Sequence, residues 1–142
     1  MPAPRIVNDC MRRKPLTISP DANLVQAIEN IVEYKLTGIT VTDDAGMPVG
    51  ILSELDCIKA VLTALYNEGD PEHVLVKDAM TTDLETCAPA DGIVEVAQAM
   101  LDTRQRRRPV LEDGKLVGQV SSSNILWALM EHSRRKMFDA QN

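Results

Sequence analysis

Two stretches of the chain carry apolar residues at helical spacing, and both carry them in the same order. The apolar side chains recur at i, i+3, i+4, i+7 and i+8, at Leu24, Ala27, Ile28, Ile31 and Val32 and again at Ile93, Val96, Ala97, Met100 and Leu101. This spacing places them on one face of an amphipathic helix. Asn23 and Gly92 precede the two stretches and are residue types that favour an N-cap. The pattern predicts two equivalent helices, each with one buried face.

A β-hairpin pattern follows each predicted helix. Apolar segments at 39–42 and 49–52 flank Asp43-Asp44-Ala45-Gly46, and segments at 109–111 and 116–120 flank Glu112-Asp113-Gly114-Lys115. Glycine at these turns accepts the positive φ that tight hairpins need. A second helix follows each hairpin, and we expect its apolar stripe to face the core. The stripes are Leu55, Ile58, Leu62 and Leu65 in the first helix and Ile125, Leu126, Leu129 and Met130 in the second.

The recurring elements belong to an internal repeat. Val7-Asn8-Asp9-Cys10-Met11 returns 69 residues later as Val76-Lys77-Asp78-Ala79-Met80, and short β segments are predicted at 16–18 and 85–87. The expected fold class is α/β (α+β), with two pseudo-symmetric β-α-β-β-α repeats packed into one module. We place the repeats at 1–66 and 76–142, the latter with a C-terminal helical tail, and a linker at 67–75. Repeats of this size are marginal alone, so the two are expected to share a core.

The amino-acid composition excludes several classes of function. The 142 residues are 44% hydrophobic but only 3% aromatic, so the core must be aliphatic, and the net charge of −6 argues against nucleic-acid binding. No apolar run approaches the roughly 20 residues of a membrane span, and the first residues lack the apolar stretch of a signal peptide. Three separated cysteines without Cys-x-x-Cys indicate small buried hydrophobes in a reducing, cytoplasmic setting. These are Cys10, Cys57 and Cys87.

The chain offers no set of residues suited to catalysis. His73 and His132 have no partner at metal-ligand or triad spacing, and the sequence holds no paired catalytic carboxylates and no Walker-type glycine loop. We therefore expect neither an enzyme nor a metal site.

The start of each second helix is the candidate binding element. Ser53 would stand at a helix N-terminus, where free N–H groups and the helix dipole favour phosphate, and Asp56 could accept hydrogen bonds from two ribose hydroxyls. The same Ser-x-x-Asp spacing also fits a plain capping box that needs no ligand. In the second copy Ser121 and Asn124 take these places, and the neutral Asn124 and the polar Gln119 depart from the first copy.

The order of elements, together with residues 109–126, which read Pro-Val-Leu-Glu-Asp-Gly-Lys-Leu-Val-Gly-Gln-Val-Ser-Ser-Ser-Asn-Ile-Leu, resembles a CBS domain twice over, as in a tandem CBS pair or Bateman module. The resemblance implies an intertwined α/β disc that commonly forms a homodimer. It also implies a stand-alone regulatory module that requires no cofactor and binds AMP, ADP, ATP or S-adenosylmethionine in clefts between the repeats. Such a module signals to a separate, unknown effector protein. The alternative is a degenerate pair that acts as a structural dimerisation module without nucleotide binding.

The resemblance also assigns residues to two unequal clefts. Ser121 and Asn124 would face the other repeat, with phosphate at Arg106 and Arg107, whereas Glu85 beside Ser53 and Asp56 would repel phosphate. Arg108 replaces the usual hydrophobe and would narrow or polarise the adenine slot. A solvated helix end is the competing interpretation of the arginine run, and it stays open for Arg104. The remaining predicted nucleotide-binding residues are Pro15, Leu16, Thr37, Gly38, Ile39 and Leu84.

Overall fold

The structure is a computed structural model that describes residues 5–141, with side chains described as far as Arg134. The chain divides into two compact units. Unit 1 is Met1–Pro15 together with Glu85–Asn142, and unit 2 is Leu16–Leu84. Unit 2 therefore holds most of the first sequence repeat and unit 1 most of the second. Arg135 and Lys136 of the predicted polar tail lie outside the described side chains.

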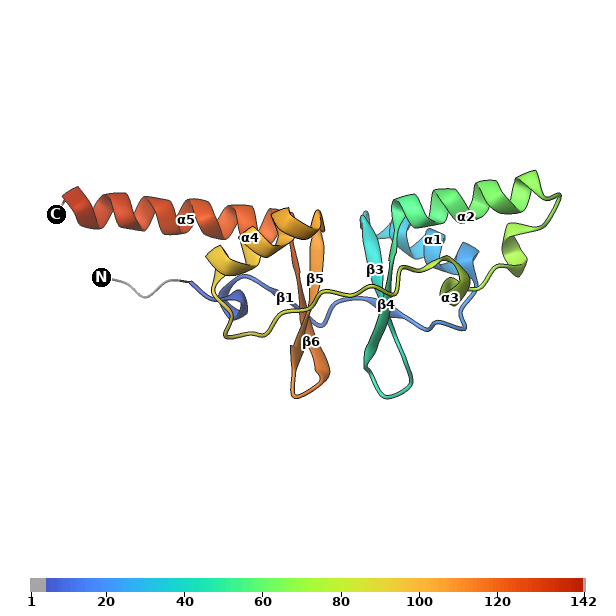
Figure 1. Ribbon diagram of the computed structural model, residues 1–142, viewed down its shortest axis with the longest axis horizontal. Helices are drawn as coiled ribbons and strands as arrows, with labels where there is room; N and C mark the ends of the chain where they lie inside the picture. The colour runs from blue at the N-terminus through green and yellow to red at the C-terminus, as the bar shows by residue number, and fades with distance from the viewer. Residues whose placement is uncertain (1–4, 142) are drawn as a thin grey trace. The chain divides into compact units, whose positions relative to one another are not determined.

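Unit 2 is a three-stranded sheet with helices packed on it (Figure 1). The strand order is β2-β3-β4, in which β2 runs parallel to β3 and β3 antiparallel to β4. The strands are β2 (Thr17–Ile18), β3 (Gly38–Thr42) and β4 (Pro48–Ser53). The helices are α1 (Leu24–Glu33), α2 (Glu54–Tyr66), the 3-10 turn η2 (Pro71–His73) and α3 (Val76–Ala79).

Unit 1 repeats this plan with a different edge strand. Its sheet has the order β1-β6-β5, and both pairings are antiparallel. The counterpart of β2 shrinks to one parallel bridge between Cys87 and Val110. The strands are β1 (Arg12–Arg13), β5 (Arg107–Glu112) and β6 (Lys115–Ser121). The helices are the 3-10 turn η1 (Val7–Asp9), α4 (Ile93–Thr103) and α5 (Ser122–Gln141).

Each unit borrows a segment from outside its own repeat. In unit 1, the Val7 amide donates to the Asp91 carbonyl (2.8 Å) and the Ile93 amide donates to the Arg5 carbonyl (3.1 Å). In unit 2, the Val76 amide donates to the Ala22 carbonyl (2.9 Å) in the same way. These bonds tie the N-terminal segment to the second repeat and the segment around α3 to the first, so the packing units differ from the sequence repeats.

The buried apolar residues form two clusters, one in each unit. Leu24, Ile39 and Leu52 are fully buried in unit 2, and Ile93, Val110 and Val120 are fully buried in unit 1. The sequence predicts one core shared by both repeats, whereas each cluster draws only on residues of its own unit. The hairpins and the amphipathic helices α1 and α4 are confirmed.

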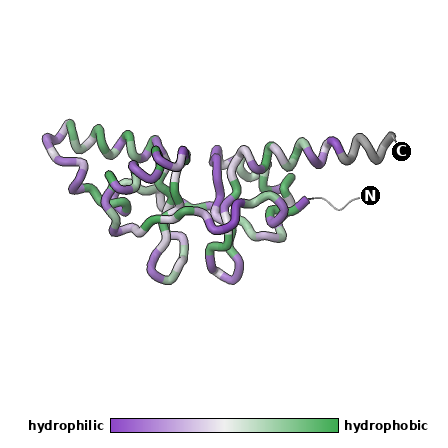
Figure 2. Tube along the Cα trace, turned by 180° about the vertical axis from the view of Figure 1, so that it is seen from behind, coloured by the Kyte–Doolittle hydropathy of each residue, from purple (hydrophilic) through white to green (hydrophobic). Residues whose placement is uncertain are grey.

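The expectation that the stripe on α2 faces the core is wrong. Leu55 is 76% exposed, and Ile58, Leu62 and Leu65 are also exposed. Cys57 is the one buried residue of α2, and Ala60 and Val61 pack against the core beside it. Leu126 and Met130 of α5 are exposed as well, while Ile125 and Ala128 are buried. Hydrophobic and hydrophilic positions alternate along α2 in Figure 2, and periodicity alone could not tell which apolar face is covered.

None of the helices in the described part of the chain combines the length and apolar character that a membrane crossing requires.

Candidate functional site

The start of α2 is fixed by a reciprocal pair of hydrogen bonds. The Asp56 amide donates to Ser53 Oγ (3.1 Å), and the Ser53 amide donates to Asp56 Oδ2 (3.0 Å). This is a complete capping box, so the structural interpretation of the motif is correct. It does not exclude binding, because a carboxylate offers about four acceptor positions and this pair uses one.

Thr81 extends this site from the borrowed segment. Its hydroxyl lies 3.3 Å from both Asp56 oxygens, and its amide and carbonyl pair with Ile51 of β4 at 2.8 and 2.9 Å. Sequence reasoning missed Thr81. The signal that could have found it is the repeat, because Arg12 stands 69 residues earlier and pairs with Gln119 of β6 in unit 1.

The motif glycines admit the borrowed segments. A Cβ on Gly50 would lie 2.5 Å from Met80 Sδ and 3.1 Å from the Thr81 carbonyl oxygen. A Cβ on Gly118 would lie 2.7 Å from Met11 Sδ and 2.9 Å from the Arg12 carbonyl oxygen. Glycine at these two positions therefore allows the close approach of a neighbouring segment of the chain.

The start of α5 has the same geometry with a different side chain. The Asn124 amide donates to Ser121 Oγ (3.1 Å), and the Ser121 amide donates to Asn124 Oδ1 (3.0 Å). Because Oδ1 must accept from Ser121, the Nδ2 group is the part of Asn124 left to meet a ligand. The helix starts thus present an acceptor in unit 2 and a donor in unit 1.

The residues before each hairpin lie beside the helix start of their own unit. The Glu54 amide donates to the Thr37 carbonyl (3.0 Å), and the Ser122 amide donates to the Arg106 carbonyl (2.7 Å). The strand pairings also place Gly38 opposite Ser53 and Arg107 opposite Ser121. The structure therefore gathers Thr37 and Gly38 at one site and Arg106 and Arg107 at the other.

Ile39 and Arg108 lie one position further along these strands. Ile39 is fully buried in the core of unit 2, and Arg108 pairs with the core residue Val120 in unit 1, where it is 6% exposed. Arg108 Nη2 donates to Thr103 Oγ1 (3.1 Å), and Arg108 Nε has no hydrogen-bond partner among the described residues. A guanidinium thus occupies a core position.

Arg104 ends α4 as its C-cap with a left-handed backbone (φ 54°) and an exposed side chain. Its place agrees with the helix-end interpretation of the arginine run.

The remaining predicted site residues lie at the boundaries between the units. Pro15 and Leu84 are half-buried, and Leu16 and Glu85 are exposed. Pro15 ends a segment of unit 1 and Leu16 begins unit 2, while Leu84 and Glu85 mark the return. Their predicted pairing with the helix start of the other repeat stays a prediction.

Two of the three thiols are buried and lose their proton less readily than an exposed cysteine. Burial is the main cause that raises the pKa of Cys57 and of Cys87 to about 11, assisted by the nearby Asp56 and Asp91 respectively. All three cysteines are free; Cys57 and Cys87 are buried, as the sequence predicts, whereas Cys10 is only half-buried. No group of three His, Cys, Asp or Glu residues in the described part of the chain could hold a metal ion.

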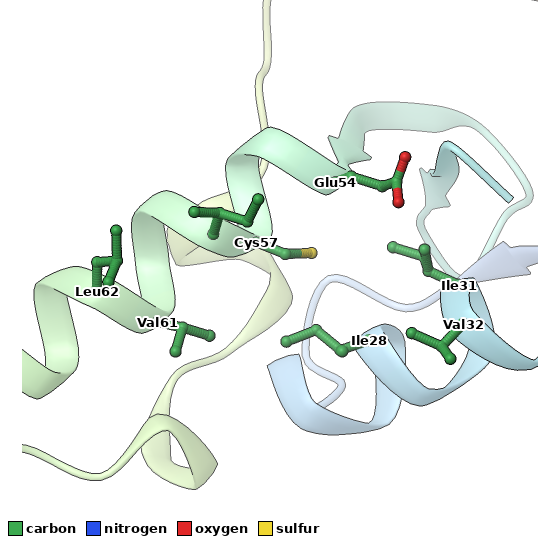
Figure 3. A pocket seen from close by; sticks show the side chains of 8 residues that line it. Ile28, Ile31, Val32, Glu54, Cys57, Val61 and Leu62 are labelled. Carbon is green, nitrogen blue, oxygen red and sulfur yellow. The ribbon is translucent and has the colours of Figure 1, made fainter.

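An apolar groove of about 330 Å³ lies between α1 and α2. Figure 3 shows the side chains of both helices and the Cys57 sulfur turned toward it. Its lining residues are Ile28, Ile31, Val32, Glu54, Cys57, Ile58, Val61 and Leu62. A smaller number of apolar residues, including Leu126, Trp127 and Met130, line a hollow on α5.

Comparisons with known proteins agree with this architecture. The crystal structure of CBSX2 in complex with AMP is 28% identical, with a TM-score of 0.78 over 90% of this chain and 98% of that one. The uncharacterized protein MJ1225 of Methanocaldococcus jannaschii is 26% identical over 84% of this chain, and the chloroplastic CBSX1 of Arabidopsis thaliana is 27% identical over 82%. The matched regions are only 41% and 60% of those two relatives.

The sequence profile of the CBS domain matches residues 7–63 and again residues 76–131. The two matches cover most of the chain and fall on the two copies of the repeat. This chain belongs to the CBS domain family, as a protein with two CBS domains in tandem.

Proposed function

We propose that the protein is a regulatory module that binds adenosine compounds and passes the binding signal to a partner protein. The observation that carries the proposal is the Asp56 carboxylate. It is fixed at the start of α2 by the Ser53 amide, it is only half-buried, and it keeps acceptor positions available beside the Thr81 hydroxyl. A carboxylate held in this way suits a ribose, whose two neighbouring hydroxyls are donors.

Similarity to CBSX2 supports adenosine as the ligand class. That protein was crystallised with AMP, and its chain aligns over nearly its full length with this one. AMP, ADP, ATP and S-adenosylmethionine remain the compounds to compare. A second site is proposed at Ser121, Asn124, Arg106 and Arg107. Pro15, Leu16, Leu84 and Arg108 stay predicted contributors, and the proposed role is binding rather than catalysis.

Isothermal titration against AMP, ADP, ATP, NAD and S-adenosylmethionine tests the proposal. Asp56→Asn is the decisive variant, because Asn124 demonstrates that asparagine completes the same capping box. We expect it to fold normally and to bind AMP roughly 10- to 100-fold more weakly, the range for hydrogen bonds to a charged group. Absence of binding by the unmodified protein at concentrations suited to micromolar affinity would contradict the proposal.

A homodimer is the second part of the proposal. Both units leave apolar side chains on their helices uncovered, on α1 and α2 in unit 2 and on α5 in unit 1. Ile58 and Leu62 line the groove between α1 and α2 and are exposed, and the exposed Trp127 is the chain's one tryptophan. Exposed apolar patches of this kind mark protein interfaces. A second copy of the chain carries the same patches and is always present, so the two copies can cover each other in a symmetric dimer.

Sedimentation equilibrium tests the dimer and its regulation together. We expect a dimer that Ile58→Glu converts to a monomer, with Lys59→Glu on the exposed side of the same helix as the charge control. If nucleotide acts as a signal, it must bind one assembly state better than another, so AMP must shift the dimerisation constant.

The alternative function is a structural dimerisation module whose sites no longer bind nucleotides. The complete capping boxes favour it, because each helix start is satisfied without a ligand. This alternative predicts a stable dimer and no titration heat with any adenosine compound. A cytoplasmic location is part of both proposals.

A further inference from the structure

The Thr81 hydroxyl lies beside the carboxylate at the start of α2. Thr81 Oγ1 is 3.3 Å from Asp56 Oδ1 and 3.3 Å from Asp56 Oδ2, although the two residues are 25 positions apart in the chain. A hydroxyl has one proton to donate, so the two oxygens share it. With one further position taken by the Ser53 amide, about two of the four acceptor positions of the carboxylate stay open.

The backbone fixes where this hydroxyl lies. Thr81 and Ile51 exchange both backbone hydrogen bonds, at 2.8 and 2.9 Å, as an antiparallel hydrogen-bonded pair does. Because residues opposite each other share a face and side chains alternate along a strand, Thr81 lies on the face of Ile51 and Ser53. The fully buried Leu52 lies on the opposite face. The hydroxyl therefore reaches Asp56 from the side of the sheet away from the core, where Thr81 is exposed.

The Asp56 carboxylate needs two restraints to stay in one orientation. The χ2 torsion of aspartate has a broad energy well, so the group rotates readily unless hydrogen bonds hold it. The Ser53 amide donates to Oδ2 (3.0 Å), and the Thr81 hydroxyl supplies the second restraint because it contacts both oxygens. A polar group that is held before the ligand arrives binds more tightly, since less side-chain freedom is lost on binding.

Unit 1 lacks this pair of a hydroxyl and a carboxylate. Its equivalent positions hold Arg12 and Asn124. Threonine is short and uncharged, so it can orient a carboxylate without forming an ion pair with it. A cationic side chain at position 81 would instead compete with a ligand for the Asp56 oxygens. The residue type at position 81 therefore suits orientation of a carboxylate that is to accept hydrogen bonds from elsewhere.

We propose that Thr81 is a positioning residue for Asp56, and that it sets how strongly the site in unit 2 prefers a ribose that carries both hydroxyls. This role rests on the proposed function, in which the Asp56 carboxylate accepts hydrogen bonds from the ribose. The Thr81 hydroxyl acts through the carboxylate, because it holds both oxygens available to two neighbouring ribose hydroxyls at once. Since Thr81 belongs to the second CBS match, 76–131, the ribose site of the first repeat is completed by a residue of the second.

Titration with AMP and with 2′-deoxy-AMP tests the role of Thr81. We expect Thr81→Val, which removes the hydroxyl and keeps the shape of the side chain, to weaken AMP binding about 3- to 10-fold, as for loss of one hydrogen bond. Binding of 2′-deoxy-AMP, which lacks one of the two hydroxyls, should weaken by less than about twofold, so the preference for AMP falls. Thr81→Ser keeps the hydroxyl and should keep AMP affinity within about twofold.

Thr82→Val is the matched control, because it makes the same substitution at the next residue. The Thr82 side chain is exposed and forms no hydrogen bond with the rest of the described chain. This variant should change AMP affinity by less than about twofold.

A double-mutant cycle separates positioning from direct contact with the ligand. Asp56→Asn removes the acceptor through which Thr81 acts, so adding Thr81→Val to it should weaken AMP binding by less than about a further twofold. If the two losses multiply in the double variant, Thr81 contacts the ligand directly and the positioning role is wrong. If Thr81→Val weakens AMP and 2′-deoxy-AMP equally, the hydroxyl only stabilises the fold, and the role is equally wrong.

The ligand-free protein separates the role of Thr81 from the proposed function. Carbon-13 relaxation of the Asp56 carboxyl group, measured by NMR, should show a more mobile side chain in Thr81→Val than in the unmodified protein and Thr81→Ser. If it does and no adenosine compound binds, the positioning of the carboxylate stands and the adenosine proposal fails. If Asp56 is equally ordered in all three proteins, the positioning role is wrong, whether or not AMP binds. If AMP binds and Thr81→Val changes neither its affinity nor the preference over 2′-deoxy-AMP, the proposed function stands without this role.

Discussion

The start of α2 and the start of α5 share a backbone and differ in chemistry. Both hold a complete capping box with bond lengths that agree between the two, and both receive a borrowed segment next to a glycine. One site presents a carboxylate beside a hydroxyl, and the other presents an amide beside arginines. The capping box fixes the backbone at each helix start. The side-chain atoms that face outward can therefore differ between the two repeats without loss of the fold.

The largest expected effect on stability comes from exchanging the residue types at two equivalent core positions, Ile39 of β3 and Arg108 of β5. Ile39→Arg should lower the free energy of unfolding by about 3–5 kcal/mol, because it places an unpaired charge in an apolar core. In unit 2 the position equivalent to Thr103 is Tyr34, so the short threonine side chain that accepts the hydrogen bond from Arg108 in unit 1 is missing there. Urea denaturation measures the change.

The reciprocal variant, Arg108→Ile, should be neutral or stabilise the protein by about 1–2 kcal/mol. A loss of more than about 2 kcal/mol in this variant would show instead that Arg108 stabilises unit 1.

The motif glycines give the next largest effect. Gly118→Ala should cost about 1–3 kcal/mol of unfolding free energy, because its Cβ would meet the Arg12 carbonyl oxygen at 2.9 Å. Gly50→Ala should cost somewhat less, since the equivalent backbone contact is 3.1 Å. Gly69→Ala, with its nearest contact at 3.4 Å, is the control and should change stability little. Equal effects at all three positions in thermal melts would contradict the role given to the borrowed segments.

Exchange of the motif residues should reverse the preference of the two sites. The double variant Asp56→Asn with Asn124→Asp keeps both capping boxes, so its stability should match that of the unmodified protein. We expect the ribose of the ligand to bind at the start of α5 in unit 1 instead of at the start of α2. We expect ADP binding to weaken about tenfold, which corresponds to about 1.4 kcal/mol. The motif asparagine is at position 124 in the unmodified protein and at position 56 in the double variant. Its side-chain amide resonance in the NMR spectrum of each protein shows whether the ligand contacts that helix start. Unchanged affinities in the double variant would mean that neither residue contacts a ligand.

The smallest effect compares the buried thiols of the two units. The folded pKa of Cys57 and of Cys87, about 11, lies above the usual 9.0, so the folded state retains the proton longer than the unfolded state. The stability that each thiol contributes is therefore present below pH 9 and is lost as the pH rises toward 11. Each should cost about 1 kcal/mol between pH 8 and pH 10.

Urea denaturation of the unmodified protein and of Cys57→Ala and Cys87→Ala isolates this loss from other titrating groups. If the pH dependence is the same in all three proteins, the thiols do not contribute to it.

Much of the fold was predictable because the repeat supplies each element twice. The hairpins at Gly46 and Gly114, the amphipathic helices and the N-cap at Asn23 follow from local chemistry. The exposed stripe on α2 did not follow, because a 3.6-residue period identifies an apolar face but not what covers it. The sequence also placed Ser53 and Asp56 at a helix start, and it left open whether they cap the helix or bind a ligand.

The sequence by itself determined the family, the order of elements and the difference in residue type between the two helix starts, since these depend on residue types at fixed spacing. Only the tertiary structure decided that the segments at 5–15 and 74–84 cross to the other repeat's unit, since long-range strand pairing leaves little local pattern. That crossing carries Thr81 to Asp56 and Arg12 to the strand before Asn124. The chemistry at each helix start is therefore set jointly by a local motif and by a residue from a distant part of the chain.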